Sequence, residues 1–303
     1  MILIHLCSAE DHPNIVETIT NDKKKFFPSR FQVKYVDDLT IAEAFNIQES
    51  VVENSDRPLP DNFHARLGQK LVPEKSLVYD EIRKVQDYAM DNEMKLNAKK
   101  SKFMLFNPTL NFDFIPEVTL ENKEIETQEE MKLLGLTLTN DLSWKSNTEN
   151  MTKKAYSRLW MIKRLKKRGA NLEDLIEIYT KQVRSVLEFG VPVWNSGITK
   201  EESMNIERVQ KSFLHIALGN RYNSYQSALD QANLEPLEER RTRLCTNIAV
   251  KASKHPKHQH WFVPNNPPGP STRSRKVEYK VPLCRLSRFK NSPIPYLTSL
   301  LNK

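Results

Sequence analysis

The chain has 303 residues, of which 39% are hydrophobic and 28% are charged, and its formal net charge of +8 corresponds to a pI near 9.2. This balance excludes a disordered polyelectrolyte, and the basic excess favours a polyanionic partner. Seven glycines argue against a glycine-rich phosphate loop, and three cysteines far apart exclude a disulfide framework. No apolar run approaches the ~18 residues of a membrane span, so we expect a soluble intracellular protein of the cytoplasm or nucleus.

The first part of the chain predicts a β-hairpin. Residues 1–30 form an N-terminal lead in which we expect no helix or strand. From Phe31 onward, short β-branched and apolar runs lie on both sides of an Asp-Asp pair in VKYVDDLTIA, an arrangement typical of two strands joined by a tight turn. Residues 46–76 contain prolines and show no period, so a long loop or insertion is expected there.

Further elements are expected before residue 140. Apolar residues at helical spacing predict a helix through SLVYDEIRKVQDYAMD, with Ser76 as its N-cap. SKFMLFN indicates a strand, VTLENKEIE a hairpin that turns at Asn122, and MKLLGLTLT one more β-permissive run.

Helical periodicity dominates residues 141–255. Ser143 is a candidate cap for a helix whose apolar stripe comprises Met151, Ala155, Leu159, Ile162 and Leu165. Later helices are expected from Asn171 to Gly190, from a Thr199–Glu202 capping box to Gly219, and from Pro236 to His255. Residues 256–303 are expected to form a loose, Pro-rich basic tail.

The adjacent carboxylates of Asp37 and Asp38 at the hairpin tip allow two interpretations. Aspartate is favoured in turns because its side chain bonds its own backbone, so turn formation alone explains the pair. The alternative is a metal site, because Mg²⁺, or Mn²⁺ in its place, prefers hard oxygen ligands and a hairpin holds them rigidly. In that interpretation Asp37 is the direct ligand and Asp38 a supporting charge. The two residues by themselves leave both interpretations open.

The motif YVDD within an apolar hairpin resembles the metal-binding palm motif of reverse transcriptases. The segments that follow are similar, in order, to the jockey-like branch of the non-LTR retrotransposon enzymes. MKLNAKKSKFMLFNP is similar to the segment after the aspartates, and EMKLLGLTLTNDLSWKSNTENMTKKAYSRLWMIKRLKK to the grip strand and first thumb helix. YTKQVRSVLEFGVPVWNSGITKEESMNIERVQKSFLHIALG resembles the next two thumb helices, and SYQSALDQANLEPLEERRTRL continues the likeness to about Lys254.

The resemblance implies an α+β protein. A partial polymerase palm, with a small antiparallel sheet, would occupy residues 31–140, and a helical thumb residues 141–255. It also implies RNA-directed DNA synthesis, in which a primer 3′-hydroxyl attacks a nucleotide α-phosphate while Asp37 and Asp38 hold the metal. The implied partners are an RNA template and a DNA primer, with no membrane.

One part of the family pattern is missing from this sequence. Reverse transcriptases carry another metal-binding aspartate at the end of an earlier palm strand, whereas Asp11 and Asp22 lie in polar stretches. We therefore expect a truncated enzyme that is inactive alone.

A basic segment lies between Met151 and Gly169 and contains no acidic residue. Its cations are Lys153, Lys154, Arg158, Lys163, Arg164, Lys166, Lys167 and Arg168. A thumb that binds a duplex needs such a surface, because neutralising phosphates releases counterions. A solvated helix face explains the same pattern, and cations at a helix C-terminus also stabilise the helix dipole.

Other candidate groups are expected to be structural. Trp144, Trp160 and Trp194 have helical spacing and are predicted to lie in the core. The arginines of EERRTR are candidates for backbone contacts or for helical ion pairs; they are Arg240, Arg241 and Arg243. HPKHQH, Cys245 and Cys284 fit no zinc spacing, so a surface histidine cluster is expected.

The tail cations could add nonspecific affinity; they are Arg273, Arg275, Lys276, Lys280, Arg285 and Arg288.

Three hypotheses for the function remain at this level. The first is the reverse transcriptase fragment. The second is a non-catalytic nucleic-acid-binding module that uses the basic segment. The third is a helical scaffold whose charge only keeps it in solution. The sequence leaves the oligomeric state open.

Overall fold

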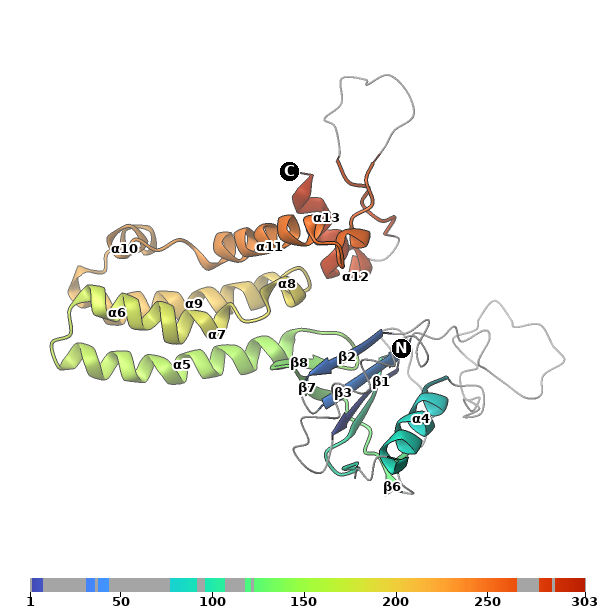
Figure 1. The fold of residues 1–303 in the computed structure, drawn as a ribbon. Coiled ribbons are helices and arrows are strands. Elements are labelled where there is room, and N and C mark those ends of the chain that lie inside the picture. The colour runs from blue at the N-terminus through green and yellow to red at the C-terminus, as the bar shows by residue number, and fades with distance from the viewer. Residues whose placement is uncertain are drawn as a thin grey trace, which may run out of the picture. The chain divides into compact units, whose positions relative to one another are not determined.

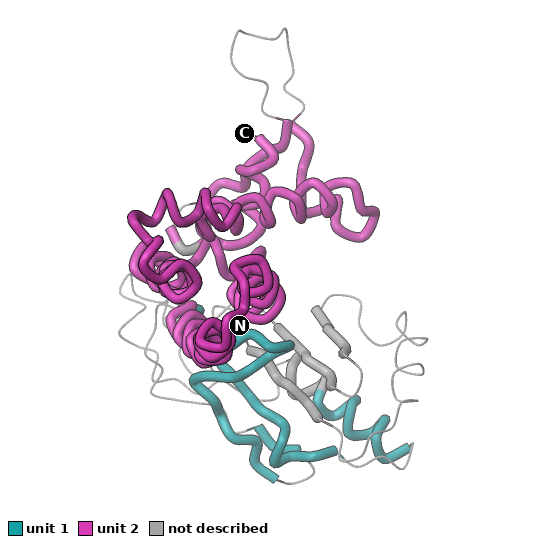
Figure 2. Tube along the Cα trace, turned by 90° about the vertical axis from the view of Figure 1, so that its left-hand side faces the viewer, with its two compact units in different colours: residues 1–142 teal, residues 143–303 magenta. Residues whose placement is uncertain are grey.

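The computed structural model describes residues 2–7, 31–35, 38–43, 77–91, 96–106, 118–120, 123–265, 278–284 and 287–302. These residues combine helices with small antiparallel sheets and are mostly helical. The chain divides into two compact units, residues 1–142 and residues 143–303 (Figure 2). None of the helices in the described part of the chain is long and apolar enough to cross a membrane.

Unit 1 contains a four-stranded antiparallel sheet in the order β2-β3-β1-β4 (Figure 1). The strands are β1 Ile2–Cys7, β2 Phe31–Tyr35, β3 Asp38–Glu43 and β4 Lys102–Leu105. Helix α4 Leu77–Asp91 connects β3 to β4. This strand order, with β1 between two later strands, is that of the split βαβ arrangement. The predicted hairpin is confirmed, because β2 and β3 pair with Tyr35 opposite Asp38.

Strand β1 differs from the expectation for residues 1–30. The weak periodicity of these residues predicts no element, yet β1 is an inner strand that pairs with β3 on one side and β4 on the other. A strand with neighbours on both edges can pair its backbone groups on both sides and bury apolar side chains. ILIHLC suits this position because it is mostly apolar. Its partners lie far away along the chain, so local periodicity carried no indication of the pairing.

Strand β4 places alternate side chains in two separate apolar clusters. Phe103 and Leu105 pack with Ile82 and Val85 of α4 and with Leu120 of β5 Thr119–Leu120. Met104, which lies between them, and Phe106, which follows the strand, pack with Met131. This alternation follows from the period of two in a strand and explains why SKFMLFN is apolar almost throughout.

Two short hairpins complete unit 1. Strand β5 pairs with β6 Lys123–Glu124, as VTLENKEIE predicts. The run MKLLGLTLT, expected as a single strand, contributes to a hairpin of β7 Glu130–Leu133 and β8 Leu136–Thr139. Both turn residues have positive φ, 47° at Leu134 and 88° at Gly135, as a type I′ turn requires. The turn was not predicted because type I′ turns usually have Asn, Asp or Gly at the first central position, where this chain has a leucine.

Unit 2 is helical. Helices α5 Lys145–Lys167, α6 Leu172–Ile178 and α9 Lys200–Leu218 contact one another (Figure 1). The segment after α6 continues as a π-helical stretch, η3 Tyr179–Arg184, and as α7 Ser185–Leu187. The remaining elements are α8 Val191–Trp194, η4 Gly219–Arg221, α10 Tyr225–Ala232, α11 Leu237–Lys254, η5 Gln259–Trp261, α12 Ser287–Lys290 and α13 Pro293–Leu301.

Local capping chemistry sets several helix ends as predicted. Thr199 and Glu202 form a complete capping box, and α9 ends at Gly219, whose φ is 57°. The Asn171 side chain accepts a hydrogen bond from the Asp174 N–H at 2.8 Å. The helix that follows does not run unbroken to Gly190, since the π-helical stretch interrupts its register.

The end of the chain is not loose throughout. Helix α13 packs on α11 and α8, and it buries Leu297 and Leu300. The Asn302 side chain accepts from Tyr279 N–H at 3.0 Å and donates to the Tyr279 carbonyl at 2.8 Å. The expectation of a loose tail over residues 256–303 is therefore wrong for these described parts, because apolar SPIPYLTSLL covers the helices that precede it.

Candidate nucleic-acid interface

Helix α5 is built on a buried stripe. Its buried residues are Asn147, Thr148, Met151, Ala155, Leu159 and Ile162, and α5 packs against α9, η3 and α7. Leu165, the last residue of the predicted stripe, is half-buried. A helix of 23 residues spans about 34 Å at 1.5 Å per residue. The stripe therefore holds one long face of α5 against the other helices and leaves the opposite face in solvent.

The exposed face carries the cations in register. Lys153, Arg164 and Lys167 are separated by eleven and three residues, so they lie on the same side of α5, opposite the buried stripe. All three are exposed, and no Asp or Glu occurs between Met151 and Gly169. Among the described residues, no carboxylate forms an ion pair with Lys153, Lys163 or Lys167. These charges are thus available to a polyanion.

Two of the predicted cations are less available. The Arg158 guanidinium donates to the backbone carbonyl of Gln182, in the π-helical stretch, so it satisfies a backbone acceptor of its own unit. Lys166 is only partly exposed. Lys154 and Lys163 are exposed on the flanks of the helix, and Arg168 is the exposed C-cap residue.

Aromatic side chains interrupt this basic surface. Trp160 is 61% exposed and Tyr156 is 43% exposed, one turn apart on α5. The Arg164 guanidinium lies 4.6 Å from the centroid of the Trp160 ring, within the range of a cation–π contact. The prediction that Trp160 lies in the core is wrong, because its position on α5 falls outside the buried stripe. We call Lys153, Tyr156, Trp160, Arg164 and Lys167 the α5 stripe.

The other two tryptophans have structural positions. Trp194 is fully buried, as predicted, and its Nε1 donates to the Phe189 carbonyl at 2.8 Å. Trp144 is half-buried and lies against Gly197. A Cβ at Gly197 would come within 2.6 Å of Trp144 Cδ1, so the close contact requires glycine at that position.

The arginines of α11 bind the protein itself. Arg240 pairs with Glu188 and Glu235, and Arg243 pairs with Glu235. Arg184 Nε lies 3.4 Å from Glu188 Oε1, so Glu188 holds two guanidinium groups from different helices. We call Glu188, Arg184, Arg240 and Glu235 the Glu188 junction. Its contacts join separate elements, whereas the helical ion pairs that were one of the two predicted alternatives would join successive turns of α11.

Arg241 is buried completely and joins three helices. Its Nε donates to Asn195 Oδ1 at 2.9 Å and its Nη2 donates to Ser203 Oγ at 2.6 Å. Burial lowers the pKa of the Arg241 guanidinium and raises the pKa of the adjacent Cys245 thiol to about 11. The thiol therefore stays protonated at neutral pH, and neither group is available to an external polyanion.

A second polar network lies under α9. The buried Gln210 accepts from Tyr179 Oη at 2.8 Å and donates to Tyr225 Oη at 3.1 Å. Tyr225 in turn donates to Glu207, and burial together with that hydrogen bond raises the pKa of Tyr225. Glu207 Oε1 also accepts from the Leu237 N–H at 3.1 Å, whereas the buried Oε2 has no hydrogen-bond partner among the described residues. The network links α9 to the elements packed against it, so we interpret it as structural.

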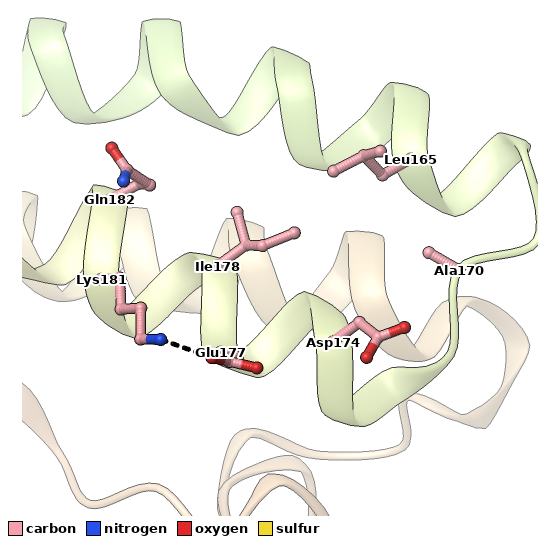
Figure 3. Close-up of a pocket in the computed structure, with 7 residues that line it drawn as sticks. All are labelled: Leu165, Ala170, Asp174, Glu177, Ile178, Lys181 and Gln182. Atoms are coloured by element: carbon pink, nitrogen blue, oxygen red, sulfur yellow. Dashed lines mark hydrogen bonds and ion pairs between the residues drawn. The ribbon is translucent and has the colours of Figure 1, made fainter.

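A surface hollow of about 430 Å³ lies between the end of α5 and α6 (Figure 3). Leu165 and Ile178 contribute apolar surface, while Asp174, Glu177 and Lys181 contribute charge. Glu177 pairs with Lys181, whose hydrogen bond lowers the pKa of the Glu177 carboxyl. The carboxylates make the hollow unfavourable for a polyanion, so it does not extend the basic surface.

The predicted metal residues lie at the limit of the described chain. Asp37 lies outside the described residues, and Asp38 is described through its backbone alone, as the first residue of β3. The register places Asp38 opposite Tyr35 of β2 on one side and opposite Cys7 of β1 on the other. Among the described residues, no group of three or more His, Cys, Asp or Glu side chains is placed to hold a metal ion. Mg²⁺ at this hairpin stays a prediction.

The histidines form the expected surface group. His255 and His260 are exposed, His258 is partly exposed, and the ring of His258 packs beside Trp261 with centroids 4.5 Å apart. Of the tail cations, Lys280 is exposed, whereas Arg273, Arg275, Lys276 and Arg285 lie outside the described residues. For Arg288 the structure describes only the backbone, within α12.

Comparisons with protein-family models, with curated proteins and with solved structures found no match for this chain. The function is therefore inferred from the chain's own residues. The most distinctive of them is the α5 stripe, and its cations could be found from sequence. Its exposed aromatic residues were missed, although their offset from the Met151–Ala155–Leu159 positions was visible in the helical period.

Proposed function

We propose that this chain is a reverse-transcriptase segment of the non-LTR retrotransposon type, in which the helical unit binds the RNA template and DNA primer. The single observation that carries the proposal is the exposed face of α5. It presents Lys153, Arg164 and Lys167 in register over more than three helical turns, with no acid between Met151 and Gly169. Glu149, one turn before Lys153, pairs with Lys145.

The physical basis is phosphate neutralisation. A duplex carries one negative charge per about 1.7 Å of helix axis, so a long helix lined with cations can contact several phosphates. Each neutralised phosphate releases condensed counterions, which drives binding without reading base sequence. A template–primer of any sequence would be bound in this way.

The hairpin of β2 and β3 supplies the second part of the proposal. Asp37 and Asp38 offer adjacent carboxylate oxygens, the ligand type that Mg²⁺ prefers, and the pairing of Asp38 with strands on both sides would hold the backbone rigid. A bound Mg²⁺ would supply Lewis-acid stabilisation of phosphate oxygens. The two carboxylates would hold and orient that ion.

Neutralising the cations of the α5 stripe tests the binding proposal. We expect Lys153→Gln, Arg164→Gln and Lys167→Gln together to weaken binding of the full chain to an RNA–DNA duplex. The slope of log affinity against log salt concentration should become shallower by roughly three, since each phosphate contact contributes about one. Fluorescence anisotropy of a labelled duplex at several salt concentrations measures this slope.

A matched control separates a site from net charge. Lys200→Gln, Lys251→Gln and Lys254→Gln remove the same charge from exposed positions on α9 and α11. The control should retain the wild-type slope. An equal loss in both triple variants, or a wild-type affinity that does not depend on salt, would contradict a binding site on α5.

The second candidate is a non-catalytic nucleic-acid-binding module. It is favoured because the cations of α5 can bind phosphates without a metal ion. Primer extension with Mg²⁺ and nucleotides separates the two candidates. Asp37→Asn should abolish any synthesis that the chain performs and leave duplex binding unchanged, because the hairpin acids are not on α5. Since the segment is expected to be truncated and inactive alone, duplex binding without synthesis agrees with both candidates. Synthesis that Asp37→Asn abolishes would show a complete metal site and contradict the non-catalytic module, and synthesis that survives Asp37→Asn would contradict the assigned metal ligand.

A further inference from the structure

We infer that the α5 stripe binds single-stranded nucleic acid by stacking an unpaired base on Trp160. This inference rests on the proposed function, because it concerns the same surface, and it adds the form of nucleic acid that the surface prefers. It comes from the structure alone, since the sequence pattern had placed Trp160 in the core.

The environment of Trp160 is unusual for a structural tryptophan. Its side chain is 61% exposed even with Arg164 against the ring, while Trp194 of the same unit is fully buried. Tyr156 lies one turn earlier and is 43% exposed, and Met161 beside them is 39% exposed. Exposing two neighbouring rings of this size forgoes the stabilisation that their burial would provide.

The cations around Trp160 identify the class of partner. Lys153 lies two turns before the ring, and Arg164 and Lys167 lie one and two turns after it. An apolar protein partner would have to desolvate these charges without compensation. A polyanion with flat aromatic groups satisfies both features, because phosphates pair with the cations and bases stack on the rings.

The spacing of the rings favours a single strand over a duplex. Residues four apart on a helix have Cβ atoms about 5–6 Å apart, whereas stacked nucleotides repeat every 3.4 Å along a strand. Bases that contact Tyr156 and Trp160 in turn cannot remain stacked on each other. Bases in a duplex are already paired and stacked, so a duplex offers phosphates to the stripe but no free base face. Arg164 is positioned to stack on the same base or to contact its phosphate.

The test compares single strands and duplex on the full chain. The probes are fluorescein-labelled oligo(dT) and oligo(rU) of roughly 12 nucleotides, within the site sizes known for single-strand binders, and an rA–dT duplex of the same length. Trp160→Ala removes the ring, Trp160→Phe keeps a smaller ring, and Met204→Ala on α9 is a control for loss of an exposed apolar side chain. Affinities are measured by anisotropy at two salt concentrations.

Trp160→Ala should weaken single-strand binding by about tenfold or more, with an unchanged salt slope, because stacking and not charge is lost. Trp160→Phe should restore most of the affinity, and Met204→Ala should have no effect. Duplex affinity should change little in all three variants. The dT and rU probes show whether the strand is DNA or RNA.

Two results would overturn the inference. Equal weakening of single-strand and duplex binding by Trp160→Ala would mean that the ring only supports the helix surface. Unchanged single-strand affinity, in a chain that still binds the duplex, would remove base stacking and leave the proposed function standing. If the wild-type chain binds neither form, both the inference and the proposed function fail.

Discussion

Trp194→Ala should lower the free energy of unfolding of unit 2 by about 3–5 kcal/mol, the usual cost of truncating a buried tryptophan. Trp194 has no solvent exposure and belongs to α8, which packs against α11 and α13. Truncation would leave a cavity there and an unpaired Phe189 carbonyl, which now accepts from Trp194 Nε1. The large effect follows from both losses.

Tryptophan fluorescence measures this change in unit 2 alone. All four tryptophans of the chain, Trp144, Trp160, Trp194 and Trp261, lie after residue 143, so urea unfolding followed by their emission does not report unit 1. Trp160→Ala is the matched control, and it should cost less than about 1 kcal/mol because the ring is exposed. Similar costs for the two variants would contradict the burial of Trp194 or the exposure of Trp160.

Glu188→Ala should destabilise unit 2 by about 2–4 kcal/mol, because it removes the carboxylate that joins the Glu188 junction. The side chains of Glu188, Arg184 and Arg240 are only 15%, 17% and 20% exposed. Without the carboxylate, two poorly solvated guanidinium groups would face each other. Arg240 donates hydrogen bonds to Glu188 that raise the pKa of its guanidinium, and Glu188→Ala removes this contribution. An arginine stays charged at neutral pH even without such a partner, so loss of a proton does not relieve the repulsion.

An exposed ion pair of the same helical spacing provides the comparison. Glu177 and Lys181 are also four residues apart, but their side chains are 61% and 68% exposed. Glu177→Ala should change the free energy of unfolding far less than Glu188→Ala, as is usual for surface pairs. Glu188→Gln should cost less than Glu188→Ala, since the amide keeps one acceptor for Arg240. If Glu188→Ala and Glu177→Ala had equal effects in urea unfolding, the junction would contribute nothing beyond a surface pair.

Both stability predictions bear on the proposed binding surface. Helix α5 presents its cations only while its buried stripe stays packed on α9, η3 and α7. Binding measurements on variants of α5 therefore need the unfolding transition as a companion measurement. A variant that loses affinity but keeps its unfolding midpoint has lost contacts with the nucleic acid.

Features that depend on neighbouring residues could be predicted from the sequence. The capping box of Thr199 and Glu202, the end of α9 at Gly219 and the pairing of β2 with β3 all follow from side chains within a few positions of one another. The apolar stripe of α5 and the concentration of cations on the same helix also follow from local periodicity.

The folded chain was needed to show which face of each helix has a partner and which distant segments meet. Strand β1 is an inner strand because β3 and β4, which lie far away along the chain, pair with its two edges. Helix α13 buries apolar side chains because it packs on α8 and α11. Of the three tryptophans that were all predicted to lie in the core, one is buried, one is half-buried and one is exposed. Burial depends on contacts between elements remote in sequence, which a local period cannot encode. The period of α5 places Trp160 opposite the apolar stripe, but only the folded chain shows that the ring on this face stays exposed.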